Sequence, residues 1–146
     1  MRGAYRVIAY LIAAGVLLQA ASVAGGWFGT INEIDGGTVI NEDYEGNLGH
    51  ALHGIIGMMV LPLLGIALLV VSFFAKLPGG VKWAGFTLLA IFVQVLLAFV
   101  AFGVPVVGAL HGLNAFVVLG CAAYAAHRIA GTRRADTLPA GAPATV

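Results

Sequence analysis

The sequence predicts an all-α integral membrane protein whose four spans form an up-down-up-down bundle. Of its 146 residues, 61% are hydrophobic and only 9% are charged, and the mean hydropathy is +1.03. Soluble domains carry about 25% charged residues, so this chain has too little charge to cover a surface in water. The apolar residues also gather in four stretches, each long enough to cross about 30 Å of hydrocarbon. We therefore expect lipid to be the main environment of the chain.

The boundaries of the spans follow from apolar length and from the breakers between them. Trp27, Trp83 and Phe102 fall near predicted span ends, where aromatic residues mark the membrane interface. The breakers at residues 77–80 and 103–105 allow only short links, which make sequential helices antiparallel neighbours. The predicted spans cover about residues 7–28, 49–75, 83–102 and 104–126.

Charge is distributed very unevenly about these spans. The seven basic residues all lie on one side of the membrane in this topology: Arg2, Arg6, Lys76, Lys82, Arg128, Arg133 and Arg134. Five of the six acidic residues lie in the loop 29–48 between the first two spans: Glu33, Asp35, Glu42, Asp43 and Glu45. The positive-inside rule then places both termini in the cytoplasm and the acidic loop outside. This predicts a multi-pass protein of the inner (plasma) membrane.

The chain is predicted to form one transmembrane domain, residues 1–134, followed by a disordered cytoplasmic tail at 135–146. An alternative for the first span is a cleavable signal peptide, because Ser22-Val23-Ala24 follows basic residues and an apolar run. Cys121 is the single cysteine, which rules out a disulfide within the chain.

A short internal repeat suggests that the bundle is a duplicated helical hairpin. Ala51-Leu52-His53-Gly54 opens the second span, and Ala109-Leu110-His111-Gly112 opens the fourth. The first and third spans carry Gln19 and Gln94 at corresponding places. Both halves run in the same direction, which predicts a repeat axis along the membrane normal. The first span is needed for this repeat, which argues against its removal as a signal peptide.

The repeated histidines are the candidate functional residues, since ionisable side chains within spans usually face the bundle interior. At 1.5 Å per residue, His53 and His111 lie roughly 7–9 Å below the outer surface. Two imidazoles facing each other at one depth predict the axial ligands of a single haem b iron. Small residues beside them would make room for the ring, and polar neighbours would accept the other imidazole N–H. These candidates are Gly54, Gly57, Gly108 and Gly112, and Gln19, Gln94 and Asn114.

Other interpretations of the histidines stay open. His50 lies one turn from His53, and could be solvated, replace it as a ligand or contact a haem propionate. His50, His53 and His111 together could instead bind copper or zinc. A third alternative is a cofactor-free structural or assembly subunit, in which the imidazoles are interhelical hydrogen-bonding groups worth about 1 kcal/mol or less each.

Paired histidines on the second and fourth helices resemble the arrangement in b-type cytochromes and in one half of haem A synthase. The overall pattern is more similar to a family of small bacterial four-span proteins of uncharacterised function, with glutamine in spans one and three and histidine early in spans two and four. The resemblance to cytochromes implies haem binding and electron transfer. Haem A synthases commonly have an arginine after the histidine; Gly54 and Gly112 replace it here, which argues against that enzyme.

The inner half of the predicted bundle offers only His127, so one haem near the outer face is expected. Such a protein would pass electrons to an external redox partner, a quinone or a larger membrane complex. No nucleophile–base pair, phosphate-binding loop or carboxylate pair is visible in the spans, so we expect an electron carrier or subunit rather than a stand-alone catalyst. The lipid bilayer is the expected partner, nucleic acid is not, and homo-oligomers stay open.

Overall fold

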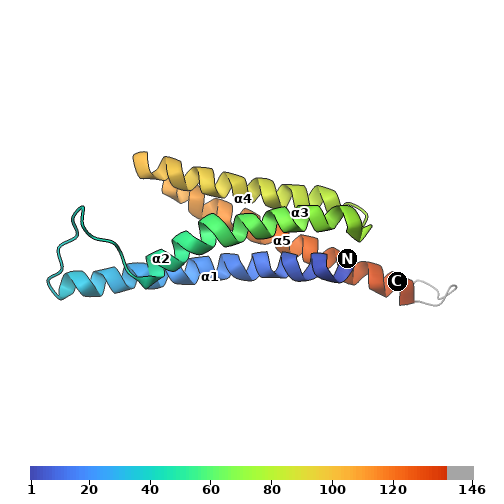
Figure 1. The fold of residues 1–146 in the computed structure, drawn as a ribbon, viewed down its shortest axis with the longest axis horizontal. Helices are drawn as coiled ribbons and strands as arrows, with labels where there is room; N and C mark the ends of the chain where they lie inside the picture. Colours follow the sequence, from blue (N-terminus) through green and yellow to red (C-terminus); the bar gives the residue numbers. More distant parts are fainter. Residues whose placement is uncertain (138–146) are drawn as a thin grey trace, which may run out of the picture.

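A computed structural model describes residues 1–137 of the protein, with side chains through His127. Within this range the fold is entirely helical, as predicted, and contains no strand (Figure 1). Four helical segments are long and apolar enough to cross a membrane: Arg2–Asp35, Leu48–Ala75, Gly80–Gly103 and Val107–His127. The elements are α1 (Arg2–Asp35), α2 (Leu48–Ile55), the π-helical turn η1 (Ile56–Val60), α3 (Leu61–Ala75), α4 (Gly80–Gly103) and α5 (Val107–Thr137).

The helix ends differ from the predicted bounds at several places. Helix α1 continues past residue 28 to Asp35, and Gly37, the second residue after it, has φ +96°, which ends the helical conformation. Helix α5 begins at Val107 rather than 104, because Pro105 pushes the residue before it out of the helical region. Helix α5 also continues to Thr137 through the start of the predicted tail, whose residues 138–146 lie outside the described range.

The second span contains a π-helical turn that the sequence analysis did not predict. The N–H of Leu61 bonds to the carbonyl of Ile56, five residues back, directly before Pro62. Proline lacks an N–H and crowds the carbonyl four residues before it, so one wider turn accommodates Pro62 without breaking the span. The resulting change of register falls directly after α2, the helix that carries His53.

The N-terminus, the C-terminal part of α5 and the α3–α4 turn lie at one end of the bundle, and the α1–α2 loop lies at the other (Figure 1). Near the first end, the hydroxyl of Tyr5 donates to the carbonyl of Gly80 at 3.0 Å. The Arg2 guanidinium donates to the carbonyl of Lys76 at 3.4 Å. The basic positions of the chain are therefore at the end opposite the acidic loop.

Close packing is concentrated at the basic end and in the middle of the bundle. The buried core there is rich in alanine, including Ala9, Ala84 and Ala122 at 0% exposure. Small side chains let apolar helices approach closely in lipid. The buried hydroxyls of Ser72 and Thr87 donate to carbonyls of their own helices, at 2.6 and 2.9 Å, so they leave no unsatisfied polar group there.

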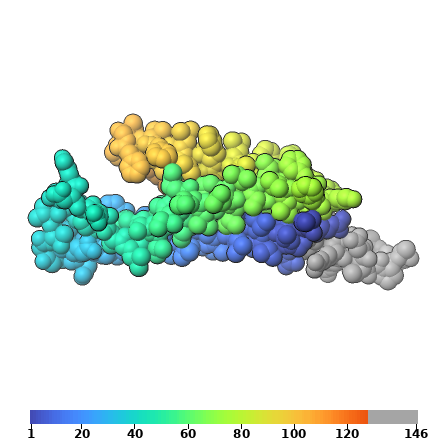
Figure 2. All heavy atoms as spheres, in the orientation of Figure 1, coloured from blue at the N-terminus to red at the C-terminus, as the bar shows by residue number. Residues whose placement is uncertain are grey.

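Towards the acidic end the two hairpins separate. Helix α2 packs against α1, while α5 packs against α4 and α1. The C-terminal end of α4 stands clear of α1 and α2 in both the ribbon and the space-filling view (Figures 1 and 2). The separation opens the bundle interior at the level of α2.

The start of α2 is fixed tightly onto α1. A Cβ added at Gly49 would overlap the backbone of Gly26, so the two helices cross at contact distance. Asn47 caps α2 by accepting from the Gly49 N–H at 3.1 Å, and its amide donates to the Gly26 carbonyl at 2.8 Å. Farther out, the Tyr44 hydroxyl donates to Glu33 at 2.6 Å and joins the loop to α1. These contacts set the height of His53 in the bundle.

Candidate functional site

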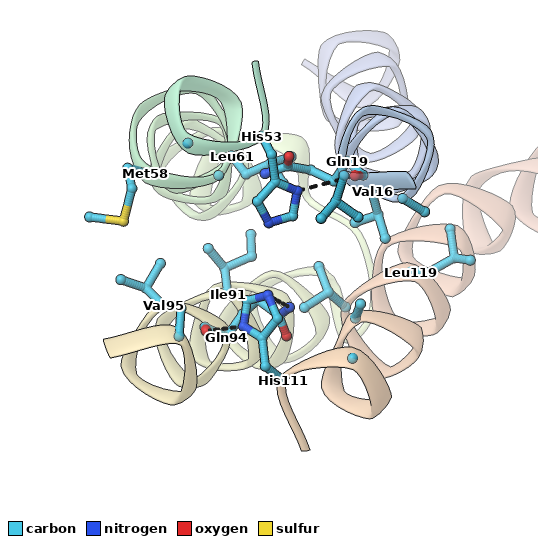
Figure 3. Close-up of a pocket in the computed structure, with 18 of the residues that line it drawn as sticks. Val16, Gln19, His53, Met58, Leu61, Ile91, Gln94, Val95, His111 and Leu119 are labelled. Carbon is cyan, nitrogen blue, oxygen red and sulfur yellow. Dashed lines mark hydrogen bonds between the residues drawn. The ribbon is translucent and has the colours of Figure 1, made fainter. Parts of the chain in front are cut away.

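A cavity of about 440 Å³ lies in the half of the bundle nearer the acidic loop and is lined by all four spans (Figure 3). Its volume lies within the range of about 300–1,000 Å³ that is usual for small-molecule sites. Only four of its lining residues are polar: Gln19, His53, Gln94 and His111. All others are apolar or glycine, so the polar chemistry of the cavity is confined to these matched pairs.

The two imidazoles face each other across this cavity, at one level of the bundle. The ring centroids of His53 and His111 are 6.2 Å apart, and the ring planes are inclined by 61°. Since a metal–imidazole bond is about 2.0–2.1 Å and a ring nitrogen lies about 1.1 Å from its ring centre, two ligands on opposite sides of one metal have centroids about 6.3 Å apart. The observed spacing would therefore allow both rings to bind one metal ion placed between them.

Each imidazole is oriented by a main-chain carbonyl of the preceding span. Nδ1 of His53 lies 3.1 Å from the carbonyl oxygen of Gln19, and Nδ1 of His111 lies 3.0 Å from that of Gln94. A carbonyl only accepts hydrogen bonds, so Nδ1 carries the proton in both rings. In the neutral ring the lone pair is then on Nε2, which points into the space between the rings (Figure 3). Metal-ligating histidines are commonly fixed by such a bond.

From the sequence, the glutamine side chains are expected to accept the second N–H of the histidines. In the structure the main-chain carbonyls of the same glutamines accept it instead. Any residue type has such a carbonyl, so the sequence gives no direct signal for this contact. The glutamine side chains behave differently in the two halves. The Gln94 amide nitrogen lies 3.2 Å from Nε2 of His111. Oε1 of Gln19 is buried and has no hydrogen-bond partner within the described part of the chain.

Asn114 contacts Gln94 rather than an imidazole. Its amide donates to Oε1 of Gln94 at 2.8 Å and to the carbonyl of Ala90 at 2.9 Å. Asn114 therefore holds the Gln94 amide in place with its nitrogen toward His111. The first half has Ile56 at the position that corresponds to Asn114, three residues after the histidine, so Gln19 has no such contact.

Three of the four predicted glycines line the cavity. A Cβ added at Gly54 or Gly112 would meet nothing within 4 Å, so contacts within the protein do not require glycine at either position. Gly57 lies against the Gln19 amide, which an added Cβ would overlap. Gly108 lies outside the cavity, where an added Cβ would touch only Ala101, at 4.0 Å.

His50 does not join the pair. Its ring packs edge-on against Trp27, with centroids 5.5 Å apart, and it lies beside Gly26 of α1. Across the residues that the structure describes, no three His, Cys, Asp or Glu side chains are grouped as a metal site. The three imidazoles considered for copper or zinc are therefore not assembled here.

The cavity walls repeat with the same spacing in both halves. Counted from each histidine, the lining residues at the first, fourth, fifth and eighth following positions are Gly54, Gly57, Met58 and Leu61 after His53, and Gly112, Ala115, Phe116 and Leu119 after His111. Around the glutamines, Val16, Ala20 and Val23 match Ile91, Val95 and Ala98. Of these walls only the glycines were predicted from the sequence, although a helical face drawn from each histidine indicates the others.

Comparisons of the chain with protein-family models, with curated proteins and with solved structures find no significant match.

The hydrogen bonds at Nδ1 predict the tautomer of both histidines. In cofactor-free protein with neutral imidazoles, we expect His53 and His111 each to carry the proton on Nδ1, because a carbonyl faces that nitrogen. Long-range proton–nitrogen correlation spectra of the ¹⁵N-histidine-labelled protein in micelles measure this. His50, which has no such carbonyl, provides the internal comparison. A proton on Nε2 of His53 or His111 would contradict the assignment.

Proposed function

We propose that this protein is a membrane cytochrome b that binds one haem b between His53 and His111 and carries single electrons. The observation that supports this most is the paired imidazoles, each anchored through Nδ1 and each presenting Nε2 to the same apolar cavity. Haem, when bound, supplies reversible one-electron oxidation and reduction. The residues of the chain supply the two ligands, their orientation and a water-poor surrounding.

Three features of the cavity fit a flat macrocycle. The imidazole spacing would let both rings bind one iron, and Gly54 and Gly112 leave open space beside each histidine. The walls repeat about the two histidines, so they offer similar apolar surfaces to both faces of a planar ring. This correspondence also supports the origin of the bundle as a duplicated hairpin.

The position of the site limits what the protein does with an electron. Both histidines lie in the half nearer the acidic loop, and His127 is far along α5 towards the basic end, with its side chain exposed. One site near one face does not by itself carry an electron across the bilayer. We infer an electron carrier, acting alone or as a small subunit, that exchanges electrons with a quinone or with a larger membrane complex.

One contact favours the cofactor-free alternative, in which the histidines only join helices. The Gln94 amide lies within hydrogen-bonding distance of Nε2 of His111, the nitrogen that would bind iron. An absorption spectrum separates the two functions, because hydrogen-bonded histidines without haem leave the protein colourless.

We expect protein purified from haem-replete cells to be red, with the sharp bands of low-spin haem after reduction. The double variant His53→Ala, His111→Ala removes both nitrogen ligands and should lose these bands entirely. Absorption spectra of the oxidised and dithionite-reduced protein measure this, and the pyridine haemochrome assay gives the amount of haem b per chain. His50→Ala is the matched control and should keep a full complement of haem. Colourless wild-type protein would exclude the proposed function.

The open glycines provide a second test, which leaves the ligands intact. In Gly54→Leu the new side chain should project into the space needed by the ring and lower haem occupancy at least about tenfold, while helix content is kept because leucine is a better helix former than glycine. Gly120→Leu is the control, since Gly120 also has open space around it but does not line the cavity. Haem per chain and circular dichroism of both variants measure this. Equal occupancy in the two would argue against a ring at Gly54.

The charge pattern supports an inner-membrane topology with both termini in the cytoplasm. We expect green fluorescent protein fused at the C-terminus to fluoresce. Alkaline phosphatase, which becomes active only after export, should be inactive at the C-terminus and active when inserted at Val39–Ile40 of the acidic loop. The reverse result would place the haem site at the cytoplasmic face.

A further inference from the structure

The two halves of the site differ chemically at one matched position, and this makes the two histidines unequal. Asn114 and Ile56 each follow their histidine by three residues. We propose that His53 is the permanent axial ligand and His111 an exchangeable one, which a small neutral diatomic molecule replaces. This inference rests on the proposed haem site and assigns it a second activity, the binding of an exogenous ligand.

His111 has a hydrogen-bond partner at both ring nitrogens. Nδ1 donates to the Gln94 carbonyl at 3.0 Å, and Nε2 lies 3.2 Å from the Gln94 amide nitrogen. With the proton on Nδ1, Nε2 is the acceptor and the amide the donor. The lone pair that would bind a metal is thus already engaged. Ligation by His111 costs this hydrogen bond, and release of His111 restores it.

Asn114 makes this contact persistent. Its amide donates to Oε1 of Gln94 at 2.8 Å and also to the carbonyl of Ala90 at 2.9 Å, so the Gln94 side chain is restricted to one orientation. The Gln94 oxygen is held away from His111, and the nitrogen is left facing it. These hydrogen bonds, which run from Ala90 through Asn114 and Gln94 to His111, therefore stabilise the His111 imidazole when it is not bound to iron.

His53 lacks this competitor. Its Nδ1 bonds the Gln19 carbonyl at 3.1 Å, and its Nε2 has no hydrogen-bond partner in the described part of the chain. Ile56 has no polar atom with which to orient the Gln19 side chain. The carbonyl fixes the direction of the ring, and no hydrogen bond within the described residues competes with ligation through Nε2. The asymmetry favours His53 as the ligand that stays.

The cavity also defines the chemical class of the replacing molecule. The walls around the histidines are apolar, and no positively charged side chain lines them. A neutral ligand is therefore favoured over an anion. The Gln94 amide N–H lies beside the position that His111 vacates and can donate to a bound molecule, a feature that governs ligand binding in distal haem pockets. In the exchange the bond from His111 Nε2 to iron breaks, one bond to the new ligand forms, and no electron is transferred.

Carbon monoxide is the probe that tests the exchange in the full-length, haem-loaded protein. The dithionite-reduced wild type should lose its sharp low-spin bands under carbon monoxide and show the spectrum of the carbonyl adduct. Gln94→Leu removes the donor to His111, so the affinity for carbon monoxide should fall by about two- to tenfold, the value of one hydrogen bond. Asn114→Leu frees Gln94 and should act in the same direction. Asn32→Leu, an amide-to-leucine change on an exposed part of α1, is the matched control and should bind like wild type.

Single histidine variants test the asymmetry independently of ligand affinity. We expect His111→Ala to retain haem in a high-spin, five-coordinate state that binds carbon monoxide rapidly, and His53→Ala to lose most of its haem. Electron paramagnetic resonance of the ferric proteins and the haem content per chain measure this. Low-spin bands unchanged by saturating carbon monoxide, or equal haem loss in the two variants, would overturn the inference while leaving the cytochrome proposal intact. A colourless wild type would remove both.

Discussion

The site depends on one interaction made twice, the hydrogen bond from a histidine Nδ1 to the main-chain carbonyl of a glutamine on the preceding span. In the interior of a lipid-embedded bundle, water is not available to satisfy a polar group, so each imidazole must find a partner within the protein. Here the partner is a helix carbonyl, which is rigidly placed. Each ring is thereby fixed in tautomer and direction, and the second nitrogen of each is directed to the space between the hairpins. The 6.2 Å spacing of the rings follows from these two anchors.

The cavity exists because packing is distributed unevenly along the bundle. Alanines such as Ala9 and Ala122 bring the helices together at the basic end, where the buried side chains interlock. At the acidic end, Gly26 and Gly49 allow α2 to pack closely on α1, where it makes no comparable contact with α4. The π turn before Pro62 lies between the open part and the closely packed part of this span. The hairpins therefore remain associated at one end while an apolar space stays open at the other.

The repeat is visible in the sequence as one tetrapeptide, and in the structure as the walls of a cavity. Met58 and Phe116 share no chemical likeness beyond being large and apolar, yet they hold matched places on the lining. Different apolar residues can fill such positions because only volume and hydrophobicity are constrained there. The two histidines make the same hydrogen bond, from Nδ1 to a glutamine carbonyl. Asn114 and Ile56 mark where the halves differ in chemistry rather than in shape.

The sequence by itself determined the helical class, the number and approximate place of the spans, and the juxtaposition of His53 and His111. These follow from low charge, apolar length and helical spacing, which are properties of continuous stretches of the chain. It also indicated Gly54, Gly57 and Gly112 as neighbours of the site. It could not assign Gly108, His50 or the roles of Gln19 and Gln94. Those depend on how far the hairpins separate, on which way α2 turns when Gly49 meets Gly26, and on main-chain carbonyls that every residue possesses. Such features arise from contacts between spans distant in the chain, and only the tertiary structure decided them.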